Sequence, residues 1–500
     1  MKQNNSVFSI KIYWLFVILI FLGSIWIRLV DINDLPLDFH PTRQLFSALK
    51  ARGMYYQDLV DIPEWQKDMA VHQWKSQHTL EPEITEWLAV TAYRQAGIAD
   101  LALPRIYSVI FWVIGGLFLF FAARRLVSPD GALLTASFYL FLPYGVLASR
   151  SFQPDPLMVA LLAIFIWALA GWSDERSWPW AILTGVFGGL AIFVKVVAIF
   201  FVAGGAVVVV LKSLSLRRAW KDTQVWSIAF LSLLPTALYY FNGLVLGSSM
   251  AQNYAGRFFP ELLLSPVFYL RWGLKLDVVI GYLAISFSLL GLLLFSKKKN
   301  GIVLGLWLGY LVYGVIFNYH FSTHDYYQMP FIPVAALSIA PLGEILSRTI
   351  RDRWEQRMLP RAAFVLIWVL TLLGAAWTVR SEMRMVDYGP LAETYREIGD
   401  ILRDEGNVVA LAKDYGYRLN YWGWLNTSHW PSEGDLWYQE KRGDPQVFPQ
   451  LFEKHAQNRS FFLVTDFDEW EAQSALQKYL LAQYPLFAEG DGYLIFDLRE

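Results

Sequence analysis

Apolar runs separated by short polar stretches fill most of the first 380 residues. About eleven of these runs approach the ~20 residues that a helix needs to cross the hydrocarbon core of a bilayer. The run 180–211 is too long for one ordinary helix, and Lys195 divides it into two short ones. The pattern predicts an α-helical polytopic membrane protein with spans near 12–30, 105–122, 131–148, 157–172, 180–194, 197–211, 225–246, 277–295, 302–317, 330–347 and 362–379.

Two stretches are too polar to span a membrane. Residues 31–103 form a large first loop, in which 44–56 and 81–96 have the pattern of short amphipathic helices. Residues 381–500 alternate helix-like and strand-like runs, at 391–403, 408–412, 450–457, 461–465, 469–481 and 493–496. We therefore predict a transmembrane catalytic domain over 1–380, which includes the first loop, and a small α/β domain over 381–500.

The distribution of Lys and Arg predicts the orientation. Loops rich in these residues face the cytoplasm, and here they carry Arg124, Arg125, Lys212, Arg217, Arg218, Lys221, Lys297, Lys298, Lys299 and the cations of 348–361. The loop 318–328 has no Lys or Arg, so it is expected outside. The first run lacks a small-residue cleavage site and is expected to be an uncleaved anchor. We expect a bacterial cytoplasmic (inner) membrane protein with a cytoplasmic N-terminus, and with the first loop and the C-terminal domain outside.

Composition excludes several classes of function. The chain is 55% hydrophobic and only 17% charged, which is less charge than a soluble protein of this length carries. A net charge of −1 argues against a nucleic-acid partner. The absence of cysteine excludes disulfides, thiolate catalysis and Cys-ligated metal. There is no Gly-rich phosphate loop, HExxH or nucleophile elbow, so the energy for a reaction should come from the donor itself.

The first group of candidate residues follows the first apolar run and holds Asp38, His40, Arg43 and Gln44. A carboxylate can take a proton from an acceptor hydroxyl, and Arg can hold a phosphate through two hydrogen bonds. The alternative is a solvated loop in which Thr42 caps the helix that follows.

A second group of candidate residues lies at the ends of other apolar runs. Prolines on both sides of Asp155 fix the backbone where the fourth run begins, and Arg150 lies just before it. Asp155 either caps that helix or serves as a catalytic carboxylate. Lys195, and Arg105 at the start of the second run, are cations at membrane depth and therefore functional candidates. Lys195 either neutralises a phosphate or reaches to the interface.

A third group lies between two late runs and comprises His320, His324, Asp325, Tyr326 and Tyr327. The two histidines are four residues apart, which would suit a metal pair on a helix. Because the segment precedes Pro330, we expect a loop that contacts the donor phosphate or sugar instead. No cofactor is expected to be required, and a divalent metal is compatible with the pattern but not supported by it.

Three motifs resemble those of the GT-C class of integral-membrane glycosyltransferases, which includes the protein O-mannosyltransferases and the aminoarabinose-lipid A transferase. They are DFHPTRQ at 38–44, QPDP at 153–156 with Arg150 before it, and HDYYQMP at 324–330. The resemblance covers residues 1–380, and the order of the motifs and their expected side of the membrane agree with the class. It implies a sugar taken from a polyprenyl-phosphate carrier and transferred to an extracytoplasmic acceptor with inversion.

The resemblance also implies that the first-loop aspartate, Asp38, is the base that acts on the acceptor. Many members have an Asp-Glu pair in this loop, whereas here His40-Pro41 follows. That departure leaves Asp155 as the alternative base.

Two other functions compete with transfer: a transporter or flippase of polyprenyl-linked glycans, and a ligase that uses such carriers. A transporter would show inverted repeats and polar residues near the middle of its spans. Here the polar residues gather at the ends of spans, and no repeat is found. The acceptor, whether lipid, polysaccharide or protein, is not specified by the sequence.

Overall fold

The computed structural model describes residues 6–79, 81–243, 258–297, 299–354 and 358–499. The chain folds into two compact units. The membrane unit comprises Met1–Ile32, Thr79–Ile84 and Arg105–Met385, and the polar unit comprises Asn33–His78, Thr85–Pro104 and Val386–Glu500. Most of the first loop thus packs in one unit with the C-terminal region, whereas the sequence had suggested that it belongs to the transmembrane domain.

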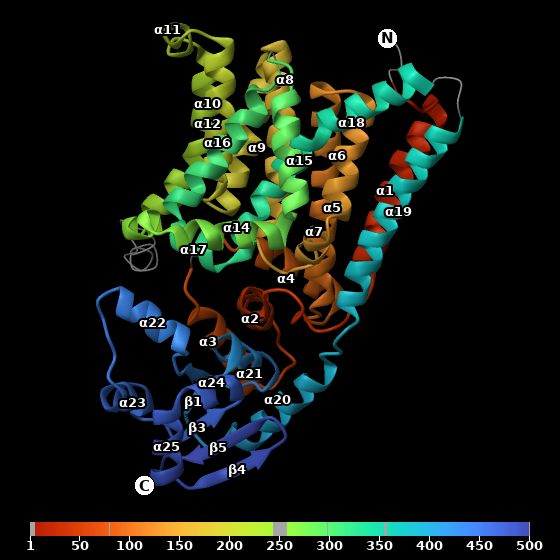
Figure 1. Ribbon diagram of the computed structural model, residues 1–500. Helices are drawn as coiled ribbons and strands as arrows, with labels where there is room; N and C mark the ends of the chain where they lie inside the picture. The colour runs from red at the N-terminus through yellow and green to blue at the C-terminus, as the bar shows by residue number, and fades with distance from the viewer. Residues whose placement is uncertain (1–5, 80, 244–257, 298, 355–357, 500) are drawn as a thin grey trace. The chain divides into compact units, whose positions relative to one another are not determined.

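The membrane unit is a helical bundle (Figure 1). Its helices are α1 (Ile10–Leu29), α5 (Ala102–Leu126), α6 (Pro129–Phe141), α7 (Pro143–Ala148), α8 (Asp155–Glu175), α9 (Trp178–Val194), α10 (Ala198–Ser213), α11 (Leu216–Ala219), α12 (Thr223–Phe241), η2 (Pro260–Leu264), α14 (Pro266–Ile280), α15 (Tyr282–Leu294), α16 (Gly301–Ile316), α17 (Asn318–Thr323), η3 (Asp325–Phe331), α18 (Ile332–Trp354) and α19 (Met358–Met383). Within the described residues, six helices are long and apolar enough to cross a bilayer, or seven if α14 and α15 form one bent span. The chain is a multi-span α-helical membrane protein, as predicted, although these helices do not establish the expected count of eleven.

Proline and glycine break two of the expected spans. The run 131–148 forms two helices, α6 and α7, because Pro143 lacks an N–H and restricts the residue before it. The axes of α14 and α15 differ by 92°. Gly281 joins them with φ +85°, a conformation that residues with a Cβ rarely adopt.

The predicted division of the run 180–211 at Lys195 is confirmed. Helix α9 ends at Val194 and α10 begins at Ala198. Lys195 itself is extended, with φ −152° and ψ 115°. The break leaves a charged side chain between two apolar helices, where the site described below is built.

Helices α10 and α16 pack closely through small residues. A Cβ placed on Gly305 would overlap the carbonyl oxygen of Gly204, and one placed on Gly309 would overlap that of Phe200. Small residues let membrane helices approach until their backbones touch, which matters because lipid supplies no hydrophobic drive for association.

Gly305→Ala is therefore expected to destabilise the membrane unit by about 1–3 kcal/mol, the usual cost of inserting a methyl group into a packed interface. The midpoint of thermal unfolding in detergent would measure the loss. Gly374→Ala in α19 is the matched control, since a Cβ there would meet no described atom within 4 Å. Equal unfolding midpoints for the two variants would contradict this packing.

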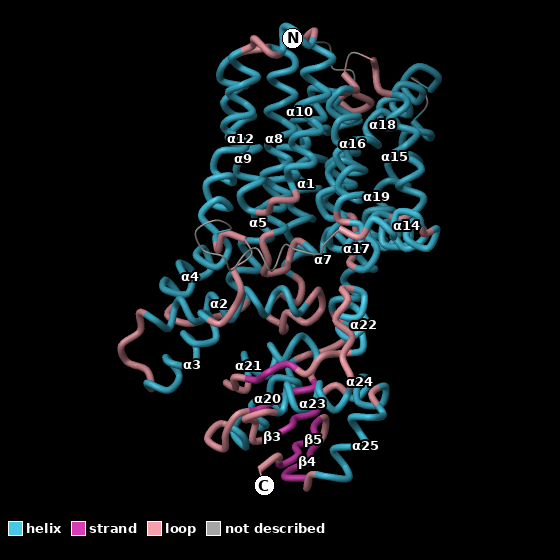
Figure 2. Tube along the Cα trace, turned by 90° about the vertical axis from the view of Figure 1, so that its left-hand side faces the viewer, coloured by secondary structure: helices cyan, strands magenta, loops and turns pink. Residues whose placement is uncertain are grey.

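The polar unit holds a mixed five-stranded sheet in the order β2-β1-β3-β5-β4. Figure 2 shows strands of this sheet in magenta, with β3, β5 and β4 labelled. Strands β2, β1 and β3 are parallel, and β5 pairs antiparallel with both β3 and β4. Its elements are α2 (Pro41–Gln57), α3 (Glu64–Lys75), α4 (Ile84–Ala96), α20 (Gly389–Leu402), β1 (Val408–Leu411), η4 (Lys413–Gly416), α21 (Tyr417–Trp422), β2 (Thr427–His429), α22 (Glu433–Lys441), α23 (Phe448–Ala456), β3 (Phe461–Val464), α24 (Phe467–Ala472), α25 (Ser474–Gln483), β4 (Leu486–Gly490) and β5 (Tyr493–Asp497). The small α/β domain is confirmed, but α3, α21, α22, β2 and β4 were not predicted.

Both faces of the central strands are buried. Val409 and Leu411 of β1 pack in one cluster with Trp430 and with side chains of α23, α24 and α25. The alternate residues Val408 and Ala410 are also buried. Parallel strands covered on both sides read as continuous apolar runs, which is why β1 and β3 could be predicted from the sequence.

Candidate functional site

A buried ion pair joins two of the predicted site residues. The Nζ of Lys195 donates to both carboxylate oxygens of Asp155, each at 2.8 Å. Asp155 is 1% exposed and Lys195 is 6% exposed. Asp155 begins α8 and makes no side-chain capping hydrogen bond, although its charge does lie in the first turn of the helix, where it suits the dipole. An isolated buried charge is costly, and the pairing compensates both charges.

Aromatic side chains from a distant part of the chain surround this pair. The Nζ of Lys195 lies 5.3 Å from the ring centre of Tyr326 and 5.8 Å from that of Tyr327. Tyr144, which the sequence did not single out, lies within electrostatic reach of Asp155, Asp325 and Tyr326. The cluster combines cationic, acidic and phenolic groups, a set suited to holding an anion and the hydroxyl groups of a sugar.

The segment that carries the two histidines is helical, not the predicted loop. It forms α17 and η3, which meet at the extended residue His324. Pro330 lies near the end of η3 and restricts only the residue before it, so α17 can form upstream. The rings of His320 and His324 are 5.8 Å apart, and His320 lies 5.0 Å from Tyr327. Among the described residues, no group of three His, Asp or Glu side chains is gathered as a metal site.

Arg105 and Arg150 are buried and bind backbone carbonyls. Arg105 donates to the carbonyls of Arg150 at 3.2 Å and of Ile32 at 2.9 Å. Arg150 donates to the carbonyl of Asp31 at 2.7 Å and also contacts the sulfur of Met383. These contacts favour a structural role, in which both arginines anchor the end of the first transmembrane segment, and the phosphate-binding role expected for them stays a prediction.

The first-loop motif lies in the polar unit. Leu37 and Phe39 are buried, whereas the alternate residues Asp38 and His40 are half-buried. The amide of Gln44 is buried and donates to the carbonyls of Pro36 at 3.2 Å and of Phe39 at 2.5 Å. These hydrogen bonds stabilise the loop. They favour a structural role for Gln44 over the predicted contact with the sugar donor.

The backbone at the start of α2 is strained. His40 adopts φ 43° and ψ 62°, in the left-handed region that non-glycine residues seldom occupy. Such conformations persist where the surrounding structure holds them, and they are frequent at functional sites. Arg43 lies beside this turn, with its guanidinium carbon 5.7 Å from the ring centre of Phe46.

Asp414, which the sequence analysis missed, ties this motif to the sheet. Its carboxylate accepts a hydrogen bond from the Thr42 hydroxyl at 2.7 Å and pairs with Arg418 at 2.5 Å. The N-cap of α2 is His40, so the alternative in which Thr42 caps this helix is wrong. Burial, followed by the nearby carboxylates of Asp38 and Asp34, raises the pKa of Tyr388, which places Tyr388 next to the motif.

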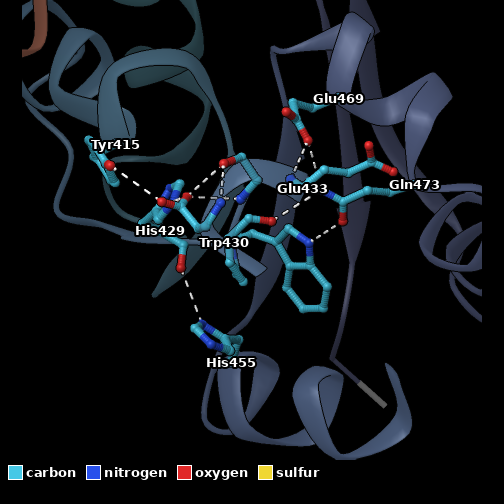
Figure 3. A network of polar contacts seen from close by, with 10 residues as sticks. Tyr415, His429, Trp430, Glu433, His455, Glu469 and Gln473 are labelled. Atoms are coloured by element: carbon cyan, nitrogen blue, oxygen red, sulfur yellow. Dashed lines mark hydrogen bonds and ion pairs between the residues drawn. The ribbon is translucent and has the colours of Figure 1, made fainter. Parts of the chain in front are cut away.

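The turn that carries Asp414 is itself strained. Asp414 and Tyr415 have φ of 55° and 57°, and Gly416 follows with φ +77°. The Tyr415 hydroxyl donates to Asp435 at 3.3 Å, and the His429 ring contacts the same carboxylate at 3.1 Å (Figure 3). These contacts fix the turn from the side of α22, at the edge where the parallel strands end.

The same edge holds further polar contacts that sequence reasoning did not find. The indole of Trp430 donates to Gln473 at 2.8 Å, and Glu469 accepts from the backbone of Glu433 at 2.9 Å. Figure 3 shows these side chains. His455 contacts the carbonyl of His429 at 3.2 Å, and burial lowers the pKa of His455. The predicted strands could have directed attention to this edge, because ligands of α/β sheets bind where the parallel strands end.

Comparisons with known proteins match both sequence and fold. A sequence family described as dolichyl-phosphate-mannose-protein mannosyltransferase matches residues 82–240, a stretch that contains Asp155 and Lys195 but not Asp38. A stretch of 131 residues is 28% identical to the lipid A galacturonosyltransferase RgtD of Rhizobium johnstonii. That stretch covers 26% of this chain and spans only 28% of the relative.

Solved structures match almost the whole chain. Apo ArnT from Cupriavidus metallidurans has a TM-score of 0.62 at 15% identity, with 98% of each chain covered. ArnT bound to undecaprenyl phosphate gives 0.60 at 14% identity with the same coverage. The oligosaccharyltransferase AglB from Archaeoglobus fulgidus gives 0.53 at 12% identity, covering 91% of this chain and 69% of that one. The resemblance predicted from the three motifs is confirmed, and the chain has the fold of the GT-C class of membrane glycosyltransferases.

Proposed function

We propose that this protein transfers a sugar from a polyprenyl-phosphate donor to an acceptor outside the cytoplasmic membrane, with inversion at the anomeric carbon. The observation that carries the proposal is the buried Lys195–Asp155 pair beside Tyr326 and Tyr327, in a fold shared with glycosyltransferases. The ArnT structure bound to undecaprenyl phosphate supports the class of donor.

Lys195 is suited to receive the donor phosphate. An ammonium group has three donors, and Asp155 takes two hydrogen bonds from it. As the bond between the anomeric carbon and the phosphate oxygen breaks, negative charge grows on the phosphate, and a fixed cation in a dry site stabilises it strongly. Asp155 keeps the cation in place. Tyr326 and Tyr327 provide phenol groups that can bind sugar hydroxyls.

Asp38 is the better candidate for the base. Both oxygens of Asp155 already bind Lys195. The resemblance assigns the base to Asp38, which is half-buried in a loop anchored by its apolar neighbours. In a single inverting displacement, the acceptor oxygen bonds to the anomeric carbon as the phosphate leaves, and the acceptor proton passes to the carboxylate. No covalent nucleophile is needed.

The proposal also covers the acceptor of the sugar and the orientation of the protein in the membrane. RgtD is named for lipid A, so lipid A is the first acceptor to test, ahead of polysaccharide and protein. We place the N-terminus in the cytoplasm and the polar unit outside, in the bacterial inner membrane, because the Lys and Arg distribution favours this orientation.

Labelled polyprenyl-phosphate sugars in proteoliposomes test this function. With lipid A present, we expect the label to move from the carrier to the acceptor for at least one sugar. Nucleotide sugars serve as the control and should not react. If the intact donor crosses the bilayer and no sugar leaves the carrier, the protein is a transporter and the proposal fails.

Asp414 is expected to act as a positioning residue for the first-loop motif. Asp414→Asn keeps an acceptor for Thr42 and tolerates the left-handed turn, but it removes the charge that pairs with Arg418. Because small misplacements near a reacting group cost rate, we expect kcat to fall on the order of tenfold with little change in KM. Asp468→Asn is the matched control, since its pair with Lys413 is exposed. Equal rates in both variants would contradict the role.

A further inference from the structure

A charged cavity lies in the membrane unit, lined by residues other than the Lys195–Asp155 pair. It has a volume of about 1290 Å³, above the about 300–1,000 Å³ of ordinary small-ligand pockets. Its walls come from the ends of α5, α8, α10 and α15, the start of α16 and part of α18. None of the residues proposed for transfer lines it.

The cavity carries an excess of four positive charges. Its lining includes two carboxylates, Asp174 and Glu344, and six cations: Arg124, Arg125, Lys212, Lys297, Lys299 and Arg348. Both carboxylates already pair with lining cations, Asp174 with Arg125 at 3.7 Å and Glu344 with Arg348 at 3.3 Å. Among the described residues, no carboxylate lies within ion-pair distance of the other four cations.

Hydrogen bonds hold two of these cations in the cavity wall. Lys299 donates to the carbonyl of Arg125, and Lys212 donates to the side chain of Asn300. Each ammonium has three donors, so these bonds fix the side chain and leave donor capacity for a ligand. Lys212 lies in the last turn of α10 and Lys299 just before α16, both on the side that the charge pattern predicts to be cytoplasmic.

Part of the remaining lining is apolar, and serine side chains line the rest of it. Leu126, Val209 and Ile302 line the cavity and are buried. A free inorganic anion would not be stabilised by these apolar side chains. A phospholipid would be, because its phosphate is attached to glycerol and acyl carbons that can pack against them. Basic pockets between transmembrane helices on the cytoplasmic side are suited to anionic headgroups.

We propose that this cavity binds the phosphate-bearing headgroup of an anionic phospholipid from the cytoplasmic leaflet. Lys212 and Lys299 contact the phosphate, and the apolar wall receives the start of the acyl chains. The site is separate from the transfer site, so the inference stands whether or not the proposed function is correct.

The purified wild-type protein provides the first test, which needs no variant. Adding phosphatidylglycerol to delipidated protein in detergent should raise the unfolding midpoint and leave bound lipid in native mass spectra, because a ligand of the folded state stabilises it. Phosphatidylcholine should do neither. If the two lipids act equally, or if millimolar inorganic phosphate stabilises the protein and phosphatidylglycerol does not, the proposal is overturned.

Paired variants locate the site. Lys212→Gln with Lys299→Gln should weaken phosphatidylglycerol binding on the order of tenfold or more, because each basic residue adds to the electrostatic attraction for an anionic lipid. Arg217→Gln with Lys221→Gln removes the same charge from exposed positions outside the cavity lining and should have little effect. Equal loss in the two pairs would show general surface attraction, and unchanged binding in the cavity pair would exclude the site.

Discussion

Asp38→Asn is expected to lower sugar transfer by about a hundredfold or more while the protein still folds and binds its donor. The change is close to isosteric and leaves the buried anchors Leu37 and Phe39 in place. It removes the group that takes the acceptor proton, and general base catalysis contributes about 10²–10⁴-fold. Transfer from a labelled polyprenyl-phosphate sugar, measured at saturating donor, gives the rate.

Two comparisons make this result specific. Asp61→Asn changes an exposed carboxylate in the same loop and should leave transfer unchanged. Asp155→Asn should impair donor use through Lys195, so its defect should appear in the donor KM as well as in kcat. If Asp38→Asn remains active and Asp155→Asn loses the full hundredfold in kcat alone, then Asp155 is the base.

Lys195→Met is expected to destabilise the membrane unit by about 3–5 kcal/mol, because it leaves the Asp155 carboxylate buried and uncompensated. The double variant Asp155→Asn with Lys195→Met should recover much of that stability, since the stranded charge is gone. It should not recover transfer, because the cation opposite the donor phosphate is missing. Thermal unfolding in detergent and transfer, measured on the same preparations, separate the two effects.

An exposed pair provides the control for Lys195. Arg94 and Asp58 form an ion pair in the polar unit with about half of each side chain exposed. Arg94→Met should therefore cost no more than about 1 kcal/mol. If the double variant is no more stable than Lys195→Met alone, the pair is not the source of the instability.

The hydrophobic pattern and the residues that interrupt helices made much of the fold predictable. Runs such as 157–172 specify a helix by length and apolarity alone, and the charge of Lys195 marks the break between α9 and α10. The buried strands β1 and β3 read as apolar runs. By contrast, β2 is three half-buried residues, too short to carry a pattern, and it becomes a strand only by pairing with β1.

The site was only partly predictable, because its chemistry depends on partners far away in sequence. Polar residues at span ends identified Asp155 and Lys195 separately, but nothing local shows that they pair across 40 positions. The contact from Thr42 to Asp414 spans 372 positions. Local sequence also could not show that Gln44 points into its own loop. Residue type indicated candidate chemistry, and tertiary packing determines which partners each candidate has.

The fate of the carrier lipid tests the central claim most directly. Wild-type protein in proteoliposomes, given a doubly labelled polyprenyl-phosphate sugar and lipid A, should release one polyprenyl phosphate for each sugar that appears on the acceptor. Asp38→Asn should release almost none. Sugar that stays on the carrier while the donor changes leaflet, at the same rate in both proteins, would contradict the account.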